Sequence, residues 1–470
     1  MKKVLILLLF LLPACLTWLS CGGSSGPAPQ TSGLPYRAFI SNSVNAGTTS
    51  AGIYIFDAQD DTRPVRPPIS AGNTPGMMVV TPNLAQTLVF SGNGTQFSDN
   101  QFSIINNSSE MNAAHATLPG MTESFVVSPD SSTAYIALPT APVVGQSPGI
   151  VEVVSLGAGT ITGQVDIPSI HYLSINNSGN RILGFSDNSD SVALITPSNI
   201  GIPNTVAVTY IGGTGVFDRP VAAFFSSDDT IAYVVSCGAE CGGTQASVQQ
   251  FNLLTNTLVA SVPACTPGTA QCAGSVALIN GSTMYLAGTP YSGGVASQPC
   301  TGQTTAATAC GLLTLIDLNT MTVIQPPVQP SNCAAGQQCP IIITDGYHNR
   351  IAMGANGQLF IGARTCTEIV APVPPPAGAE IRGCLSIYNT LTSAVGTVPA
   401  GAVVIPPDNG DATGIQPIGT RTVVYVIQGG SLGIYDVTTD ALLNDAQLSN
   451  DPGRITNLVG QFIDVKIVNF

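Results

Sequence analysis

The sequence predicts an all-β protein built from repeated four-stranded units. Short apolar runs rich in β-branched and aromatic residues alternate with tight polar turns, and this pattern recurs along the chain. Each unit has an apolar strand, a tight turn, a second apolar strand, a variable loop, a strand ending in most copies in Asp or Asn, and a weaker last strand. Repetition on this scale indicates a β-propeller, in which each unit forms one blade of a ring.

The first half of the unit occurs seven times, as two buried strands joined by a short turn. The first strands are predicted at 77–80, 125–127, 173–175, 222–224, 276–278, 351–353 and 414–416. The second strands follow at 88–90, 134–136, 182–184, 232–234, 284–286, 359–361 and 424–426.

The third strand occurs eight times, which favours eight blades. Seven blades are the alternative, if the unit around Ile351 is an insertion. The opening unit begins at its second strand, at 38–41, whereas 463–467 is a lone strand at the C-terminus. We expect this last strand to complete the first blade and close the ring. The third strands are predicted at 53–57, 102–106, 150–154, 192–196, 248–252, 312–317, 385–389 and 432–436.

The turns resemble a known repeat. Residues 75–83 and the run from Ser128-Pro129-Asp130 to Tyr135 resemble the YVTN-type repeats of lactonase-like and surface-layer β-propellers. Phe39-Ile40-Ser41-Asn42 stands where that repeat has its namesake tetrapeptide, and the likeness runs from about residue 36 onward. It implies a propeller fold and, because the family contains both, either a binding role or lactone hydrolysis. Later blades depart from the pattern, with Asn280-Gly281 in place of the Pro-Asp turn.

The N-terminus predicts an exported bacterial protein. Lys2 and Lys3 precede an apolar run at 4–12, which is typical of a secretory signal peptide, here 1–20. We expect Cys21 to carry a lipid, with Cys15 as the alternative acceptor. Residues 21–35 are then a lipidated cysteine and a flexible Gly, Ser and Pro stalk, followed by the propeller at 36–470.

No later run approaches the roughly 20 apolar residues of a transmembrane helix. The expected location is therefore the cell envelope, at the outer membrane or in the periplasm, with the cell surface as an alternative. Contact with the membrane is expected only through the lipid.

The remaining cysteines form close sequential pairs, which predict disulfides and an oxidising compartment. Their spacings do not match zinc or c-type haem motifs, and with only three histidines we expect no metal and no cofactor. All pairs fall in loops expected on one face of the ring. A rigid face suggests recognition, and resistance to proteases is the alternative. The pairs are Cys237 with Cys241, Cys265 with Cys272, Cys300 with Cys310, Cys333 with Cys339, and Cys366 with Cys384.

Charge is scarce in this sequence. Charged residues make up 8% of the chain, and 13 basic against 26 acidic residues give a formal net charge of −13 at pH 7. An acidic chain without basic clusters is not expected to bind nucleic acid. We expect a monomer whose partner is a protein, a glycan or a small molecule.

The residues that precede the inner strands are expected to ring the mouth of the central channel. A carboxylate, an imidazole and a guanidinium there are able to polarise a carbonyl and activate water, as lactone hydrolysis requires. The alternative is that these polar residues cap backbone groups at strand entries. The candidate catalytic residues are Glu123, His171, Arg219, His348 and Asp411, with Arg350 beside His348.

Two functions remain open from the sequence. The first is a binding or scaffold module that acts through the disulfide-bearing face. The rival is a lactonase-like hydrolase with its site at the channel mouth. The sequence has no Gly-x-Ser-x-Gly or His-Glu-x-x-His motif. Asp57, Asp317 and Asp436 recur at strand ends, where we expect them to form turns rather than to bind calcium.

Overall fold

The computed structural model forms two compact units, Met1–Gly33 and Leu34–Phe470, and the description below concerns the second. Cys15 and Cys21 lie outside the described residues. No helix in the described part of the chain is long and apolar enough to cross a membrane. The structure describes residues 31–43, 50–92, 99–265, 272–290, 310–326, 341–366, 384–406, 410–419, 421–443 and 461–469.

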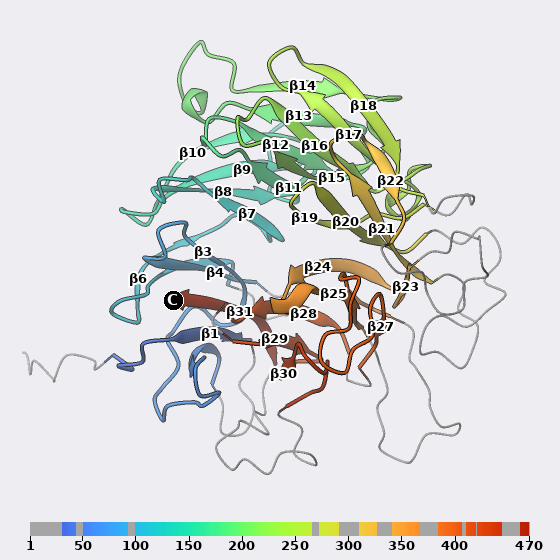
Figure 1. The fold of residues 1–470 in the computed structure, drawn as a ribbon. Helices are drawn as coiled ribbons and strands as arrows, with labels where there is room; N and C mark the ends of the chain where they lie inside the picture. Colours follow the sequence, from blue (N-terminus) through green and yellow to red (C-terminus); the bar gives the residue numbers. More distant parts are fainter. Residues whose placement is uncertain are drawn as a thin grey trace, which may run out of the picture. The chain divides into compact units, whose positions relative to one another are not determined.

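Eight antiparallel sheets form a ring, and each sheet is one blade of a β-propeller (Figure 1). The predicted fold class is confirmed with eight blades, because the unit around Ile351 is a complete blade and not an insertion. Within the described residues six blades have at least four strands and two have three. In those two, isolated bridges stand at the fourth position: Ile53 with Ile69 and Asp57 with Thr62 in blade 1, and Tyr435 with Leu442 in blade 8.

The strands follow chain order from the centre outwards, except that the C-terminal strand belongs to blade 1. Blade 1 contains β31 (Phe462–Asn469), β1 (Arg37–Asn42) and β2 (Gly52–Asp57). Blade 2 contains β3 (Pro75–Val80), β4 (Gln86–Ser91), β5 (Gln101–Asn106) and β6 (Met111–Thr117). Blade 3 contains β7 (Ser124–Val127), β8 (Thr133–Leu138), β9 (Ile150–Ser155) and β10 (Thr160–Asp166). Blade 4 contains β11 (Ile170–Ile175), β12 (Ile182–Ser186), β13 (Ser191–Ile195) and β14 (Val208–Gly212).

The second half of the ring is built in the same way. Blade 5 contains β15 (Pro220–Phe225), β16 (Ile231–Ser236), β17 (Ser247–Asn252) and β18 (Thr257–Pro263). Blade 6 contains β19 (Val276–Asn280), β20 (Thr283–Gly288), β21 (Gly311–Asp317), β22 (Thr322–Ile324) and β23 (Ile341–Ile343). Blade 7 contains β24 (Tyr347–Met353), β25 (Gln358–Arg364), β26 (Leu385–Asn389) and β27 (Val403–Val404). Blade 8 contains β28 (Ala412–Pro417), β29 (Val423–Gln428) and β30 (Ser431–Asp436). Three short 3-10 helices are η1 (Pro197–Asn199), η2 (Gly238–Cys241) and η3 (Ala355–Gly357).

The C-terminal strand closes the ring. β31 pairs antiparallel with β1, with Phe39 opposite Lys466, and forms the inner edge of blade 1. It lies next to β3 of blade 2 and β28 of blade 8. The expected closure by the two terminal strands is therefore confirmed.

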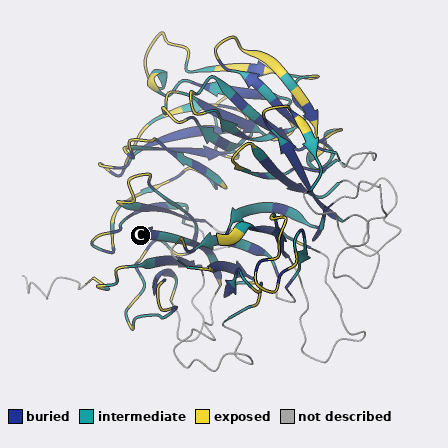
Figure 2. Ribbon diagram, in the orientation of Figure 1, coloured by how far each residue is buried: buried dark blue, intermediate teal, exposed yellow. Residues whose placement is uncertain are grey.

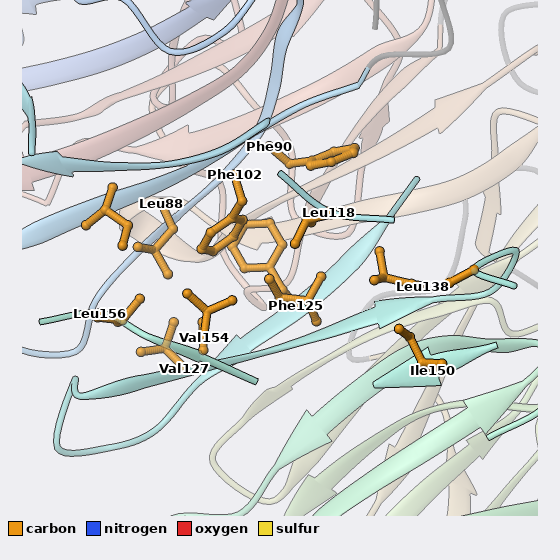
Figure 3. Close-up of a cluster of buried hydrophobic side chains, with 14 residues drawn as sticks. Leu88, Phe90, Phe102, Leu118, Phe125, Val127, Leu138, Ile150, Val154 and Leu156 are labelled. Carbon is orange, nitrogen blue, oxygen red and sulfur yellow. The ribbon is translucent and has the colours of Figure 1, made fainter. Parts of the chain in front are cut away.

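The hydrophobic core lies between neighbouring blades. The cluster between blades 2 and 3 joins side chains of both sheets, and the rings of Phe102 and Phe125 meet edge to face at 5.3 Å (Figure 3). Each large apolar side chain buried in this way contributes about 1.5–3 kcal/mol to folding. Figure 2 shows second strands such as β25 buried, inner strands such as β24 mostly intermediate in exposure, and outermost strands such as β18 largely exposed.

Side chains of one blade bind the inner strand of the next. The backbone N–H of Leu173 donates to Ser124 Oγ at 3.0 Å, and that of Ala223 donates to Ser174 Oγ at 3.1 Å. At the closing blade the N–H of Met78 donates to Asp464 Oδ2 at 2.9 Å. An inner strand has no strand neighbour on its channel side, so these bonds satisfy backbone donors that the sheet leaves unpaired.

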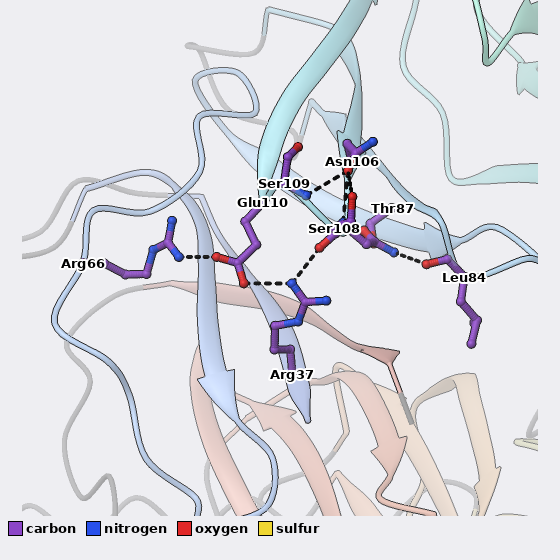
Figure 4. A network of polar contacts seen from close by, with 9 residues as sticks. Arg37, Arg66, Leu84, Thr87, Asn106, Ser108, Ser109 and Glu110 are labelled. Atoms are coloured by element: carbon purple, nitrogen blue, oxygen red, sulfur yellow. Dashed lines mark hydrogen bonds and ion pairs between the residues drawn. The ribbon is translucent and has the colours of Figure 1, made fainter. Parts of the chain in front are cut away.

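Two buried carboxylates, each paired with arginine, hold blade 1 against its neighbours. On the side of blade 8, Arg421 Nη2 donates to Asp61 Oδ2 at 2.7 Å. On the side of blade 2, Arg37 Nη1 donates to Glu110 Oε1 at 2.8 Å, and Arg66 binds the other oxygen of Glu110 (Figure 4). The Asp61 and Glu110 side chains are 2% and 0% exposed. Buried carboxylates of this kind require their cationic partners.

The aspartates at the strand ends form turns, as expected. Asp57 Oδ1 accepts from the backbone N–H of Gln59 at 2.9 Å, and Asp317 Oδ1 accepts from that of Asn319 at 2.9 Å. Asp436 Oδ1 accepts from the N–H of Thr438 at 2.7 Å. These bonds order the turn that follows each third strand.

The pair between Arg421 and Asp61 yields a stability prediction. Arg421→Gln leaves a buried carboxylate without its cation, and we expect a loss of about 3 kcal/mol in the free energy of unfolding. Urea unfolding followed by circular dichroism measures this loss. Arg181→Gln is the matched control, because Arg181 Nη1 donates to a backbone carbonyl, that of Leu253, at 2.6 Å. Equal losses in the two variants would show that the ion pair has no special role.

Candidate functional site

A cavity of about 600 Å³ lies where the inner strands begin. Its walls come from blades 1 to 7, through residues at the starts of the inner strands and others at the ends of the second strands. Polar and apolar groups both face the space. Its polar and charged lining includes Glu123, His171, Tyr172, Asp187, Ser275, Tyr347, Arg350 and Arg364. Its apolar lining includes Met77, Phe90, Met121, Val221, Phe224 and Val276.

His171 is held between two carboxylates at this mouth. Its Nδ1 lies 2.8 Å from Asp187 Oδ1, and its Nε2 lies 3.5 Å from Glu123 Oε2. The imidazole stacks on the ring of Tyr172, with 4.2 Å between centroids. Glu123 precedes β7, His171 lies in β11 and Asp187 follows β12, so blades 3 and 4 build the group together.

The two carboxylates set the protonation of His171. Burial alone lowers the pKa of the imidazole, but the hydrogen bonds and charges of Glu123 and Asp187 outweigh burial and raise that pKa above 6.5. The same hydrogen bond lowers the pKa of Glu123, with smaller contributions from the charges of Arg364 and Arg350. The two carboxylates therefore favour the imidazolium form of His171.

Two tyrosines and two arginines complete the charged wall. The hydroxyls of Tyr172 and Tyr347 lie 3.0 Å apart, and burial raises the pKa of both. Arg350 is anchored by the backbone, because its Nε donates to the carbonyl of Thr413 at 2.9 Å. Arg364 ends β25, directly opposite Tyr347 in the register of blade 7.

A loop from blade 5 adds a buried carboxylate beside this wall. Glu240 Oε1 accepts from Ser275 Oγ at 3.1 Å, and Glu240 Oε2 accepts from the N–H of Thr289 at 3.0 Å. Burial raises the pKa of Glu240 to about 7 despite these two bonds. The disulfide between Cys237 and Cys241 closes the loop that carries this residue.

Of the five candidate residues from the sequence, the structure brings Glu123 and His171 together at the cavity. His348 also borders the cavity, but it is fully buried, and burial lowers its pKa to about 4. Its ring lies beside Gly311 of β21, where an added Cβ would come within 2.9 Å of the His348 Cε1, so the imidazole packs between blades 6 and 7. The register of β24 shifts between His348 and Arg350, and Arg350 lines the cavity.

Arg219 and Asp411 also leave the expected ring. Arg219 has φ +57, and its Nη1 lies 3.6 Å from Asp190 Oδ1 at a second cavity of about 390 Å³. Asp411 Oδ1 accepts from the backbone N–H of Thr365 at 2.7 Å. Asp411 therefore caps a backbone group, which is the alternative that the sequence left open.

The sequence analysis missed Asp187, Tyr172, Tyr347, Arg364 and Glu240. The order of the strands was a signal for Asp187 and Arg364, because in an antiparallel blade the second strand ends on the face where the first strand begins. Tyr172 and Tyr347 also lie at strand starts, directly beside the candidates His171 and His348. Glu240 lies in an irregular loop, so strand periodicity carries no signal for it.

Three disulfides are present in the described residues, on the loops that surround the mouth. They join Cys237 to Cys241, Cys265 to Cys272 and Cys366 to Cys384. Cys310 is also disulfide-bonded. Cys300, Cys333 and Cys339 lie outside the described residues. Disulfides in this number are typical of an oxidising compartment outside the cytoplasm.

The part of the chain that the structure describes holds no group of three or more His, Cys, Asp or Glu side chains arranged to bind a metal ion. The mouth presents two guanidinium groups, an imidazole between carboxylates, and phenols around an apolar floor.

No protein-family model matches the sequence, and neither does any curated protein. Among solved structures, the dihydro-haem d1 dehydrogenase NirN is 11% identical over 92% of this chain and 75% of that chain, with a TM-score of 0.53. The hydrazine synthase of Kuenenia stuttgartiensis is 12% identical over 78% of this chain and 96% of that chain, with a TM-score of 0.51. The periplasmic gluconolactonase PpgL of Pseudomonas aeruginosa is 12% identical over 92% and 98%, with a TM-score of 0.47. At such identities, the first two likenesses show the β-propeller fold alone.

Proposed function

We propose that this protein is a binding module of the bacterial cell envelope, and that its ligand is a small molecule held in the cavity at the disulfide-bearing mouth. The cavity itself carries the proposal. Its volume of about 600 Å³ lies within the roughly 300–1,000 Å³ of small-molecule sites, and it combines an apolar floor with a few converging polar groups.

The walls of the cavity are rigid, which favours binding. Seven blades supply the walls, six of them through their inner strands. The polar groups are fixed by bonds such as those of His171 to Asp187 and of Arg350 to the carbonyl of Thr413. Disulfides restrain two of the loops nearby. Preformed walls lower the cost of ordering side chains when a ligand binds.

The rival function, lactone hydrolysis, is less well supported by the same geometry. A general base must be unprotonated to accept a proton from water. The carboxylates on either side of His171 raise its pKa, which disfavours the unprotonated imidazole. Ser275 Oγ is engaged by Glu240 and by the carbonyl of His348 rather than by His171. The resemblance to YVTN-type propellers prompted the lactonase hypothesis. In this proposal the resemblance concerns only the origin of the fold, and it does not argue for hydrolysis.

The cavity proposal predicts the effect of filling the space. Ala222 lies in β15 and lines the cavity, so Ala222→Phe places a ring inside it. We expect any small molecule found to bind, by a thermal-shift screen followed by calorimetry, to lose at least about tenfold in affinity, equivalent to about 1.4 kcal/mol.

Ala260→Phe is the matched control for that variant. Ala260 belongs to the outermost strand of the same blade and packs partly buried against the same hydrophobic cluster as Ala222. Binding that survives Ala222→Phe, or that falls equally in both variants, would mean that the ligand does not occupy the mouth.

His171 provides a prediction about pH. Because its pKa is raised in the folded protein, we expect NMR titration to give a value above 6.5, and Asp187→Asn to lower that value. By linkage, the contact stabilises the fold fully below pH 6.5, and this contribution is lost as the pH rises through the folded pKa. His348, with a pKa lowered to about 4 by burial, is an internal reference in the same spectra.

The titration also separates the two functions. A folded pKa of His171 below 6.5, together with lactone hydrolysis above the spontaneous rate that His171→Gln abolishes, would replace the binding proposal with the hydrolase. Under the binding proposal we expect no such turnover at neutral pH.

Attachment to the envelope through a lipid on Cys21 belongs to the same proposal. We expect the mature protein to fractionate with membranes, with the lipid mass on the peptide that begins at Cys21. Cys21→Ser should abolish the lipid, whereas the control Cys15→Ser should retain it. Mass spectrometry of the N-terminal peptide decides between them, and the reverse pattern would assign the lipid to Cys15.

A further inference from the structure

We infer that the ligand is a small organic acid, whose carboxylate binds Arg364 and whose apolar body lies along the floor of the cavity. This inference rests on the proposed function, since it assumes that the cavity at the mouth is the binding site. Three features support an acid as the ligand: the unsatisfied guanidinium of Arg364, the charge balance of the cavity and the composition of its floor.

Arg364 has an incompletely satisfied guanidinium. Its Nε is buried and has no hydrogen-bond partner, and within the described residues its side chain forms no ion pair. Leaving buried donors without acceptors is costly, more so for a charged group. Because Arg364 lines the cavity, a bound acceptor can reach this guanidinium.

The other arginines of the described propeller have partners. Arg37, Arg66, Arg219 and Arg421 lie against carboxylates, and Arg63 stacks over the ring of Tyr54. Two more donate to backbone carbonyls, Arg181 to that of Leu253 and Arg350 to that of Thr413. In a chain with so few charges, an arginine without an acceptor at a cavity wall points to an acceptor from outside.

The charge of Arg364 is directed at the cavity. It lowers the pKa of Glu123 and that of Tyr347, although burial leaves the Tyr347 pKa raised on balance. Glu123 does not neutralise the charge of Arg364, because the Glu123 carboxylate is paired with His171.

When His171 is protonated, the charged side chains of the described residues that line the cavity leave an excess of one positive charge. The cations are Arg350, Arg364 and the protonated His171, and the anions are Glu123 and Asp187. The nearby Tyr172 and Tyr347 are neutral phenols, because burial raises the pKa of each. A singly charged anion balances this set, and a carboxylate matches the planar fork of a guanidinium.

The floor of the cavity selects the rest of the ligand. Met77, Met121, Phe224 and Val276 present apolar surface to the same space. Burying apolar surface against them contributes about 25 cal/mol per Å², so an acid with an aliphatic or aromatic body is favoured over a highly hydroxylated one.

Isothermal titration calorimetry with hexanoate and hexanamide tests the inference, because the two probes share an apolar body and differ in charge. We expect the wild-type mature protein to bind hexanoate at least about tenfold more tightly than hexanamide. Arg364→Gln should remove this preference, and Arg364→Lys should retain part of it, since lysine keeps the charge but not the fork. Arg219→Gln, at the second cavity, should leave it unchanged. Thermal melts of all variants verify that they are folded.

The outcomes separate this inference from the proposed function. Equal binding of the two probes by the wild-type protein, or a preference that survives Arg364→Gln, would overturn the acid as the ligand. The acid is also overturned as the ligand if neither probe binds while other compounds do, and Ala222→Phe abolishes the binding of those compounds. In that case the proposed function stands. If no compound shows sensitivity to Ala222→Phe, the proposed function fails together with the inference.

Discussion

The pairing of β31 with β1 is the constraint on which the rest of the structure depends. It joins the two ends of the propeller and supplies blade 1 with its innermost strand. Without β31, the inner edge of β1 is unpaired, and blades 8 and 2 lose the strand that lies between them. Gly414 of blade 8 packs so closely on Asp464 that an added Cβ would lie 3.0 Å from the Asp464 Cα. The cavity depends on the same closure, since Ile463 of β31 forms part of its wall.

Charged side chains support the structure at particular joints of the ring. At the joint of blade 1, Asp61, Glu110 and Asp464 are buried, and each is paired with a cation. At the joint of blades 4 and 5, Asp229 accepts from the backbone N–H groups of Asn177 and Ser178. At the mouth, His171 lies between two carboxylates and Arg364 lines the cavity. In each place the contribution of a charge depends on its position and its partners.

The sequence predicted the fold well because the fold depends on periodic features. Every predicted first, second and third strand overlaps a strand of the structure, and the count of third strands correctly favoured eight blades. The site was predicted only in part, because a single irregularity changes which side chain reaches the mouth. The register shift in β24 accompanies a fully buried His348 and an Arg350 that lines the cavity, and the left-handed backbone of Arg219 accompanies a side chain at another cavity. Neither irregularity is visible in the alternation of apolar residues.

The mouth combines what the regular strands fix with what the loops add. Inner strands place His171 and Arg350, since β-sheet geometry leaves little freedom at their Cα atoms. Glu240 has no such support from a strand, and burial of its carboxylate is unfavourable enough to raise its pKa to about 7. Two donors, Ser275 Oγ and the N–H of Thr289, offset part of that cost, and the disulfide between Cys237 and Cys241 restricts the alternative positions of the loop. A propeller with the same strands but different disulfide-bonded loops would keep the floor of this cavity and change its rim. In the proposed binding site, the floor and the rim would therefore both determine selectivity.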